Sequence, residues 1–188
     1  MKHTNSKFYR YYVLLITSIL TSFCVIAQSE NIPSGSFIIN MGNTNTASIN
    51  DDVKPYGMIY DLMRNYNVPV KWVIATGKVK DGIDFTHNGI TYKGGTFIIP
   101  AGFRTSAVEA RISYWQTQGV VGATSVSDFT ANVYKTLVAV PRWTLDAANG
   151  GIAQGYLTAA GITLAAFPNA YNWKGPQTLD CCDDFFVM

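Results

Sequence analysis

Residues 96–100, Thr96-Phe97-Ile98-Ile99-Pro100, are the stretch on which the expected fold depends. An almost continuous apolar run favours a strand that is covered on both faces, and such strands are typical of parallel sheets. The preceding pair Gly94-Gly95 marks a turn that separates this strand from the segment before it. The run therefore predicts a buried strand within a sheet.

Outward from this strand, apolar runs alternate with segments of helical periodicity. The first helix is expected to begin at Asp51 or Asp52, with Pro55 in its first turn, and to end near residues 65–67. This alternation predicts an α/β domain with a mainly parallel sheet flanked by helices. The other expected helices are residues 106–118 and 151–160, and the other expected strands are residues 36–41, 70–74, 120–126 and 136–140.

A β-hairpin is predicted near residues 83–93, as an insertion into that sheet. Its signal is Asn88-Gly89 between two β-rich runs, because this dipeptide suits the tight turn between paired strands. His87 lies beside the turn, so we expect it to be an exposed turn residue.

Residues 1–27 are interpreted as a signal peptide. A basic segment precedes an apolar stretch at residues 12–26, and Val25-Ile26-Ala27 fits the cleavage pattern, so the mature chain would begin between Ala27 and Gln28. A membrane anchor is the alternative, but the stretch is short and is interrupted by hydroxyl residues. The sequence thus predicts export to the cell surface or medium, with no stable membrane span after cleavage. The basic residues are Lys2, Lys7 and Arg10.

Removal of this segment takes away three basic and no acidic residues, which changes the formal charge from +2 to −1. A nucleic-acid-binding protein would show a basic patch or stripe, so nucleic acid is excluded as a partner. Residues 28–35 are expected to be a polar leader, and residues 36–188 a single α/β domain. The apolar ending Phe185-Phe186-Val187-Met188 resembles the first half of a buried strand. We therefore expect the domain to be incomplete at its C-terminus and the chain to be an N-terminal fragment of a larger protein. The alternative is a short terminal strand docked in the sheet.

Cys181 and Cys182 are the only cysteines after residue 27. Export would place them in an oxidising setting. They are a possible disulfide, although adjacent cysteines form a strained bridge and each could instead pair with another partner.

Sequence motifs give no catalytic residue, no metal site and no cofactor for this chain. The chain lacks a nucleophile elbow, a P-loop, a dinucleotide-binding glycine motif and a zinc-protease motif. His87 is the only histidine after the predicted signal peptide, which excludes a site built from several histidines of this chain.

A ligand-binding rim is the better candidate site, because ligands of open α/β sheets bind beyond the carboxyl ends of the strands. Arginine and tryptophan together suit a glycan or a protein neighbour. The alternative is that Arg104 and Trp143 only stabilise loops. The candidate rim residues are Asn43, Asn45, Thr76, Arg104, Arg142 and Trp143.

Several phrases support a resemblance to a known family. They are residues 54–62 (KPYGMIYDL), 67–74 (NVPVKWVI), 80–85 (KDGIDF), 94–101 (GGTFIIPA), 141–144 (PRWT) and 182–188 (CDDFFVM). With these phrases the chain resembles the N-terminal region of large secreted surface proteins of Bacteroidota. Such proteins often carry repeat domains and a C-terminal sorting signal for type IX secretion or gliding motility.

The resemblance implies a flavodoxin-like α/β domain similar to class I glutamine amidotransferases, and it carries over no catalytic residue. We therefore expect an exported, cell-surface or secreted scaffold or binding module of a larger adhesion-type protein, with a glycan or a surface protein as its partner. The alternative is an amidotransferase-like or hydrolase-like enzyme whose catalytic residues lie beyond residue 188.

Overall fold

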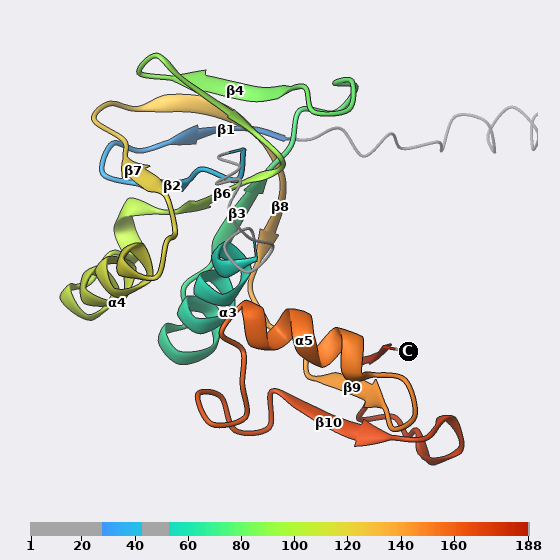
Figure 1. Ribbon diagram of the computed structural model, residues 1–188. Helices are drawn as coiled ribbons and strands as arrows, with labels where there is room; N and C mark the ends of the chain where they lie inside the picture. Colours follow the sequence, from blue (N-terminus) through green and yellow to red (C-terminus); the bar gives the residue numbers. More distant parts are fainter. Residues whose placement is uncertain (1–27, 43–52, 188) are drawn as a thin grey trace, which may run out of the picture.

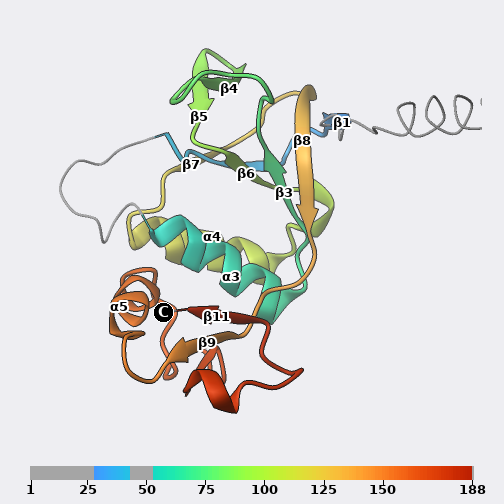
Figure 2. The same cartoon turned by 90° about the vertical axis from the view of Figure 1, so that its right-hand side faces the viewer.

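The computed structural model describes residues 28–42 and 53–187. They form a large antiparallel sheet with two helices on one face and a β-hairpin on the other, followed by a smaller sheet with its own helix (Figures 1 and 2). Several expectations fall outside the described residues. These are the signal peptide with Ala27, the rim residues Asn43 and Asn45, and the helix caps Asp51 and Asp52.

The large sheet has six strands in the spatial order β1-β8-β3-β6-β2-β7. Every neighbouring pair in it is antiparallel. In spatial order the strands are Gln28–Ile32, Phe129–Leu137, Val70–Val73, Thr96–Ile99, Phe37–Ile39 and Gly122–Thr124.

The helices of this part connect strands that are not neighbours. Helix α3 (Lys54–Tyr66) connects β2 to β3, and α4 (Ser106–Thr117) connects β6 to β7. Strand β6 lies between β2 and β3 and is antiparallel to both, and β2 separates β6 from β7 in the same way. This arrangement is the split β-α-β topology, and the four strands β3-β6-β2-β7 have the ferredoxin-like order.

The predicted flavodoxin-like, mainly parallel sheet is therefore wrong. A helix crossover does return the chain so that β2 and β3 run in the same direction, as the alternation of elements predicted. The prediction failed because strands joined by a helix need not be adjacent. The hairpin between β3 and β6 reverses the chain, so that β6 enters the gap between β2 and β3.

Burial of the 96–99 run is confirmed, since all four residues of β6 are buried. Helices α3 and α4 cover one face of the sheet around Phe97 and Ile99, while the hairpin covers the other face around Ile98. Two covering layers thus explain the apolar run without a parallel sheet.

The predicted hairpin is confirmed as β4 (Ile83–His87) and β5 (Ile90–Lys93). Asn88 and Gly89 have φ values of 50° and 75°, and two positive φ angles are what a type I′ turn requires. His87 is buried rather than exposed, and its ring stacks on Phe129 with a centroid distance of 4.2 Å. The His87 ring thus packs the hairpin against the large sheet.

The C-terminal unit is a small parallel sheet with the order β10-β9-β11. Strand β9 (Trp143–Asp146) leads through α5 (Gly151–Ala159) to β10 (Tyr171–Lys174), and β11 (Phe185–Val187) pairs with the other side of β9. Figure 2 shows this unit packed beside α3. The buried residues of its core are Tyr60, Leu145, Ala160, Ile162, Phe167, Ala170 and Tyr171.

Three boundary predictions need correction. The expected polar leader contains β1, whose one fully buried apolar side chain, Ile32, gave little signal. Of the strand expected at residues 136–140, only residues 136 and 137 belong to a strand, the end of β8, which alternates between exposed and buried residues over 130–134. The segment 162–180, in which no helix or strand was predicted, contains β10. Two short 3₁₀ helices complete the fold at Ala101–Phe103 and Pro176–Thr178.

Candidate functional site

The structure separates the predicted rim residues into two places. Thr76 is exposed in the turn after β3. Arg104 follows β6 of the large sheet, whereas Arg142 and Trp143 belong to the entrance of β9 in the small sheet. Of the described rim residues, only the last two lie together, so the six do not form one binding edge.

Arg104 is fully engaged within the fold. Its Nη2 donates to Glu109 Oε2 at 2.8 Å, and its Nη1 donates to the Gly35 carbonyl and to Thr124 Oγ1. The guanidinium also lies over the ring of Phe37, 5.7 Å from its centroid. These contacts tie together the start of α4 and two strand ends, which is the loop-stabilising role that the sequence left open.

Arg142 and Trp143 contact other parts of the C-terminal unit and of α3. The Arg142 amide donates to Asp184 Oδ2 at 2.9 Å, and its Nη2 donates to the Cys182 carbonyl at 2.7 Å. Trp143 packs against Tyr60, with ring centroids 5.1 Å apart. Arg142 therefore orders the loop before β11, while Trp143 lines a groove beside α3.

This apolar groove is the first candidate site. It has a volume of about 410 Å³ and lies between α3, the link from β8 to β9, and α5, a size typical of ligand pockets. Among the described residues that line it, tyrosine hydroxyls are the only titratable groups. The lining residues are Val53, Tyr56, Ile59, Tyr60, Met63, Leu137, Ala139, Val140, Pro141, Trp143, Tyr156, Leu157, Ala160 and Ile162.

The groove exists because α3 is apolar on two sides. Met58 and Leu62 face the large sheet and are fully buried. Ile59 and Met63, offset around the same helix, line the groove. The spacing of these residues predicted the helix, whereas a second apolar side of that helix was not predicted.

Tyr60 links the groove to the core of the C-terminal unit. Burial raises the pKa of its hydroxyl, and the hydrogen bond from Arg64 Nη1, 2.6 Å long, opposes that shift. The hydroxyl is thus held as a hydrogen-bonded, neutral phenol at the edge of the groove.

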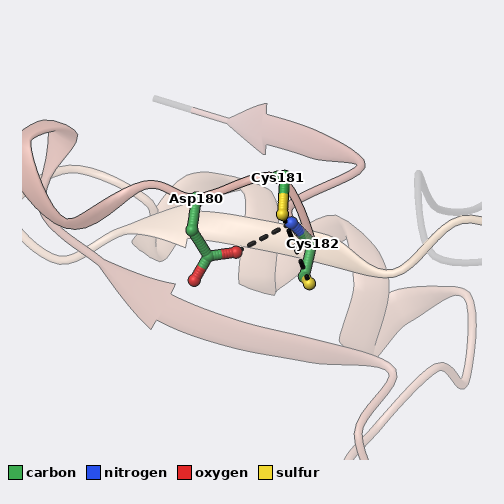
Figure 3. A group of neighbouring side chains, drawn as sticks. All are labelled: Asp180, Cys181 and Cys182. Atoms are coloured by element: carbon green, nitrogen blue, oxygen red, sulfur yellow. Dashed lines mark hydrogen bonds between the residues drawn. The ribbon is translucent and has the colours of Figure 1, made fainter.

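The second candidate site is the loop between residues 178 and 185, where Asp180, Cys181 and Cys182 lie together (Figure 3). The Asp180 carboxylate accepts a hydrogen bond from the Cys182 amide at 2.8 Å. Both cysteines are exposed free thiols whose Sγ atoms are 3.9 Å apart. Their pairing as a disulfide stays a prediction, and the nearby Asp180 carboxylate, which the sequence analysis did not consider, is of a type that can ligate a metal ion.

Polar contacts hold this loop on the small sheet. Lys174 Nζ bonds Asp180 Oδ2 at 2.9 Å and Asp183 Oδ2 at 2.8 Å, and Thr144 Oγ1 donates to Asp183 Oδ1 at 2.6 Å. Lys174 and Thr144, together with the Asp180 backbone amide, hold the pKa of the Asp183 carboxyl far below its usual range. Asp183 is therefore a charged anchor beneath the loop.

Two other buried acids have structural partners. Asp61 on α3 accepts hydrogen bonds from Trp115 Nε1 at 2.7 Å and from Asn65 Nδ2 at 2.8 Å, and pairs with Arg111 of α4. Asp84 accepts from the amides of Ala75 and Gly95, each at 2.9 Å. These carboxylates have hydrogen-bond partners, as buried polar groups usually do, and they hold elements of the fold together.

Comparison with protein-family models, curated proteins and solved structures finds no match to this chain. Of the helices in the part that the structure describes, none combines the length and the apolar character that crossing a bilayer requires.

Proposed function

We propose that this chain is an exported binding module of a larger adhesion-type surface protein, and that the apolar groove is its binding surface. The signal-peptide pattern at residues 1–27 and the resemblance to Bacteroidota surface proteins support export. The observation that carries the binding role is an open groove of about 410 Å³ whose lining offers hydrophobic contact.

A protein partner that inserts apolar side chains is the ligand class that fits this groove best. Tyr56 and Tyr156, at 49% and 51% exposure, stand at the groove as accessible aromatic side chains, and tyrosine is enriched at protein–protein interfaces. A glycan would need several hydrogen-bonding groups, which the lining described above supplies only as tyrosine hydroxyls and the Trp143 indole. The chemistry of the groove thus favours the surface-protein partner over the glycan partner.

The structure does not support the alternative of an amidotransferase-like or hydrolase-like enzyme. It relied on a flavodoxin-like domain, which the antiparallel sheet contradicts. No feature of the described residues favours it over binding, and we do not carry it further.

The binding role is tested by panning the full chain against displayed random peptides. Peptides with clustered apolar side chains should be enriched and should bind in solution. Ala139→Arg places a charge in the groove and should weaken that binding at least about tenfold, since one charge left without a partner opposes burial. Val126→Arg, at a residue outside the groove that is 75% exposed, should leave it unchanged.

Two results would overturn this assignment. One is peptide binding that Ala139→Arg and Val126→Arg weaken equally. The other is selective binding on a glycan array that does not respond to Ala139→Arg, which would place a glycan site elsewhere.

Export is tested separately by expressing the chain in a bacterium with an outer membrane and sequencing the N-terminus of the exported product. The mature product should begin at Gln28. A product that keeps residues 1–27 and stays inside the cell would contradict export without affecting the groove.

A further inference from the structure

We propose that Asp180, Cys181 and Cys182 form a binding site for a thiophilic divalent cation of the Zn²⁺ type. One ligand atom from each residue can be chosen so that all three lie within 4.8 Å of one another, and all three residues are exposed. Two thiolates and a carboxylate are ligands that Zn²⁺ takes in proteins. The site is distinct from the groove and independent of the binding role proposed for it.

The spacing of the two sulfur atoms fits one shared ion. Two sulfur atoms that each lie about 2.3 Å from a tetrahedrally coordinated Zn²⁺ are about 3.8 Å apart. The Sγ atoms of Cys181 and Cys182 are 3.9 Å apart. The thiols therefore need little movement to hold one ion between them.

Adjacency in sequence favours a shared ion over a disulfide. The Cα atoms of neighbouring residues joined by a trans peptide bond are about 3.8 Å apart, whereas disulfides usually need about 4.4 to 6.8 Å. The described residues contain no cis peptide bond. Coordination avoids the backbone change that a bridge between these two residues would require.

The loop is already ordered in the arrangement that coordination needs. Asp180 Oδ1 accepts from the Cys182 amide, Asp183 Oδ2 accepts from the Asp180 amide at 2.8 Å, and Arg142 Nη2 donates to the Cys182 carbonyl. Figure 3 shows the Asp180 carboxylate directed toward the Cys182 amide, with the two sulfur atoms beside it. Because these hydrogen bonds hold the backbone of the loop, binding orders little additional chain.

Lys174 is the competing cation at this site. Its ammonium bonds both Asp180 and Asp183, so it keeps one carboxylate partner when Asp180 turns toward a metal ion. Asp180 also has free lone pairs, since a carboxylate offers about four acceptor positions. Asp183 thus positions the loop through the Asp180 amide, and Asp180 keeps acceptor positions for an ion.

The test titrates Zn²⁺ alone into the reduced full chain by calorimetry, with Co²⁺ as a spectroscopic probe. One ion should bind per chain, with release of up to two thiol protons to solvent and a thiolate-to-cobalt absorption band. Cys181→Ser and Cys182→Ser should each weaken binding at least about a hundredfold, and Asp180→Asn about tenfold, by loss of a ligand. The control Asp81→Asn removes a carboxylate outside the site and should change nothing.

Three results would overturn the proposal. They are the absence of stoichiometric Zn²⁺ binding to the reduced chain, binding that survives in the Cys181→Ser/Cys182→Ser double variant, and binding weakened equally by Asp180→Asn and Asp81→Asn. Circular dichroism of each variant verifies that its fold is intact. Zinc protection of both thiols from alkylation gives a readout that a merely destabilised loop would not produce.

Discussion

Single buried carboxylates hold the covering layers of this protein together. Asp61 is 1% exposed and joins α3 to α4 through Arg111 and Trp115. Its three donors leave no room for solvent, so the charge depends entirely on its partners. Truncation at this residue leaves the buried Trp115 indole without its acceptor and the half-buried Arg111 guanidinium without its carboxylate. Removing one partner of a buried ion pair is strongly destabilising.

We expect Asp61→Ala to lower the free energy of unfolding by about 3 to 5 kcal/mol. The matched variant Glu109→Ala breaks the Arg104 ion pair, whose acid is 42% exposed, and should cost no more than about 1 kcal/mol. Urea unfolding followed by circular dichroism measures both. Equal losses for the two variants would show that Asp61 is not an energetic anchor.

The environment of Tyr92 determines how the free energy of unfolding changes at alkaline pH. Burial against the sheet raises the pKa of its hydroxyl above the usual value near 10. The unfolded chain therefore loses this proton at a lower pH than the folded chain does. Stability from this group is present below pH 10 and falls as the pH rises above it.

We expect Tyr92→Phe to reduce the loss of unfolding free energy between pH 9 and pH 11, while changing stability at pH 7 little. The control Tyr134→Phe alters a tyrosine that is 43% exposed and should keep the wild-type slope. Chemical unfolding at a series of pH values gives both slopes, and the same slope in wild type and Tyr92→Phe would refute the prediction.

At the scale of elements, a close approach of backbones fixes how α3 meets the C-terminal unit. A Cβ atom on Gly57 would lie 1.7 Å from the Ala160 carbonyl oxygen and 2.9 Å from Trp115 Cη2. The carbonyl belongs to backbone at the end of α5, so it cannot move away as a flexible side chain can. The absence of a side chain at Gly57 therefore sets the distance between these two helices.

We expect Gly57→Ala to lower the free energy of unfolding by at least about 2 kcal/mol, because it forces α3 and α5 apart. Gly155→Ala is the matched control, since a Cβ on that glycine of α5 meets nothing within 4 Å. It should stabilise the protein by up to about 1 kcal/mol through better helix propensity. Thermal unfolding of both variants measures the difference, and a stabilising Gly57→Ala would contradict the packing.

Local patterns predicted these elements better than they predicted the sheet. The turn chemistry of Asn88-Gly89 and the helical spacing of Met58, Ile59 and Leu62 are properties of neighbouring residues, so the hairpin and α3 were predicted from the sequence. The pairing of β1 with β8 joins Ile32 to Phe129, and no local rule contains that information. The strand order, and with it the antiparallel direction, followed from such distant pairings.

The candidate sites differ in how far the sequence predicted them, for the same reason. Arg104 and Arg142 each follow a stretch expected to be a strand, but Arg104 follows β6 of the large sheet whereas Arg142 directly precedes β9 of the small sheet, so the predicted rim does not assemble. Cys181 and Cys182 are adjacent in sequence, so their proximity was predictable, whereas their closeness to the Asp180 carboxylate depends on the fold of the loop. The groove forms only where α5 packs beside α3, and no sequence motif predicts that packing.

At the scale of the whole molecule, Tyr60 connects the large sheet to the C-terminal unit. It belongs to α3, yet it packs on Trp143 and Phe167 of the other unit, with ring centroids 5.1 and 5.2 Å away. The two units have separate cores, and Tyr60 belongs to the core of the C-terminal unit although it lies on α3. Loss of the ring should therefore let the C-terminal unit open without unfolding the large sheet.

We expect Tyr60→Ala to speed amide hydrogen exchange in β9 and β10 at least about tenfold, which corresponds to about 1.4 kcal/mol of local stability. Exchange in β3 and β6 should stay close to the wild-type rate, because their core contacts with α3 run through Met58 and Leu62 instead. Tyr134→Ala removes a tyrosine that packs on Trp72 of the large sheet, 5.5 Å away, and should leave β9 and β10 unchanged. Mass spectrometry of exchanged peptides separates the two regions. Equal acceleration in all four strands of Tyr60→Ala would mean that the chain unfolds as one cooperative unit.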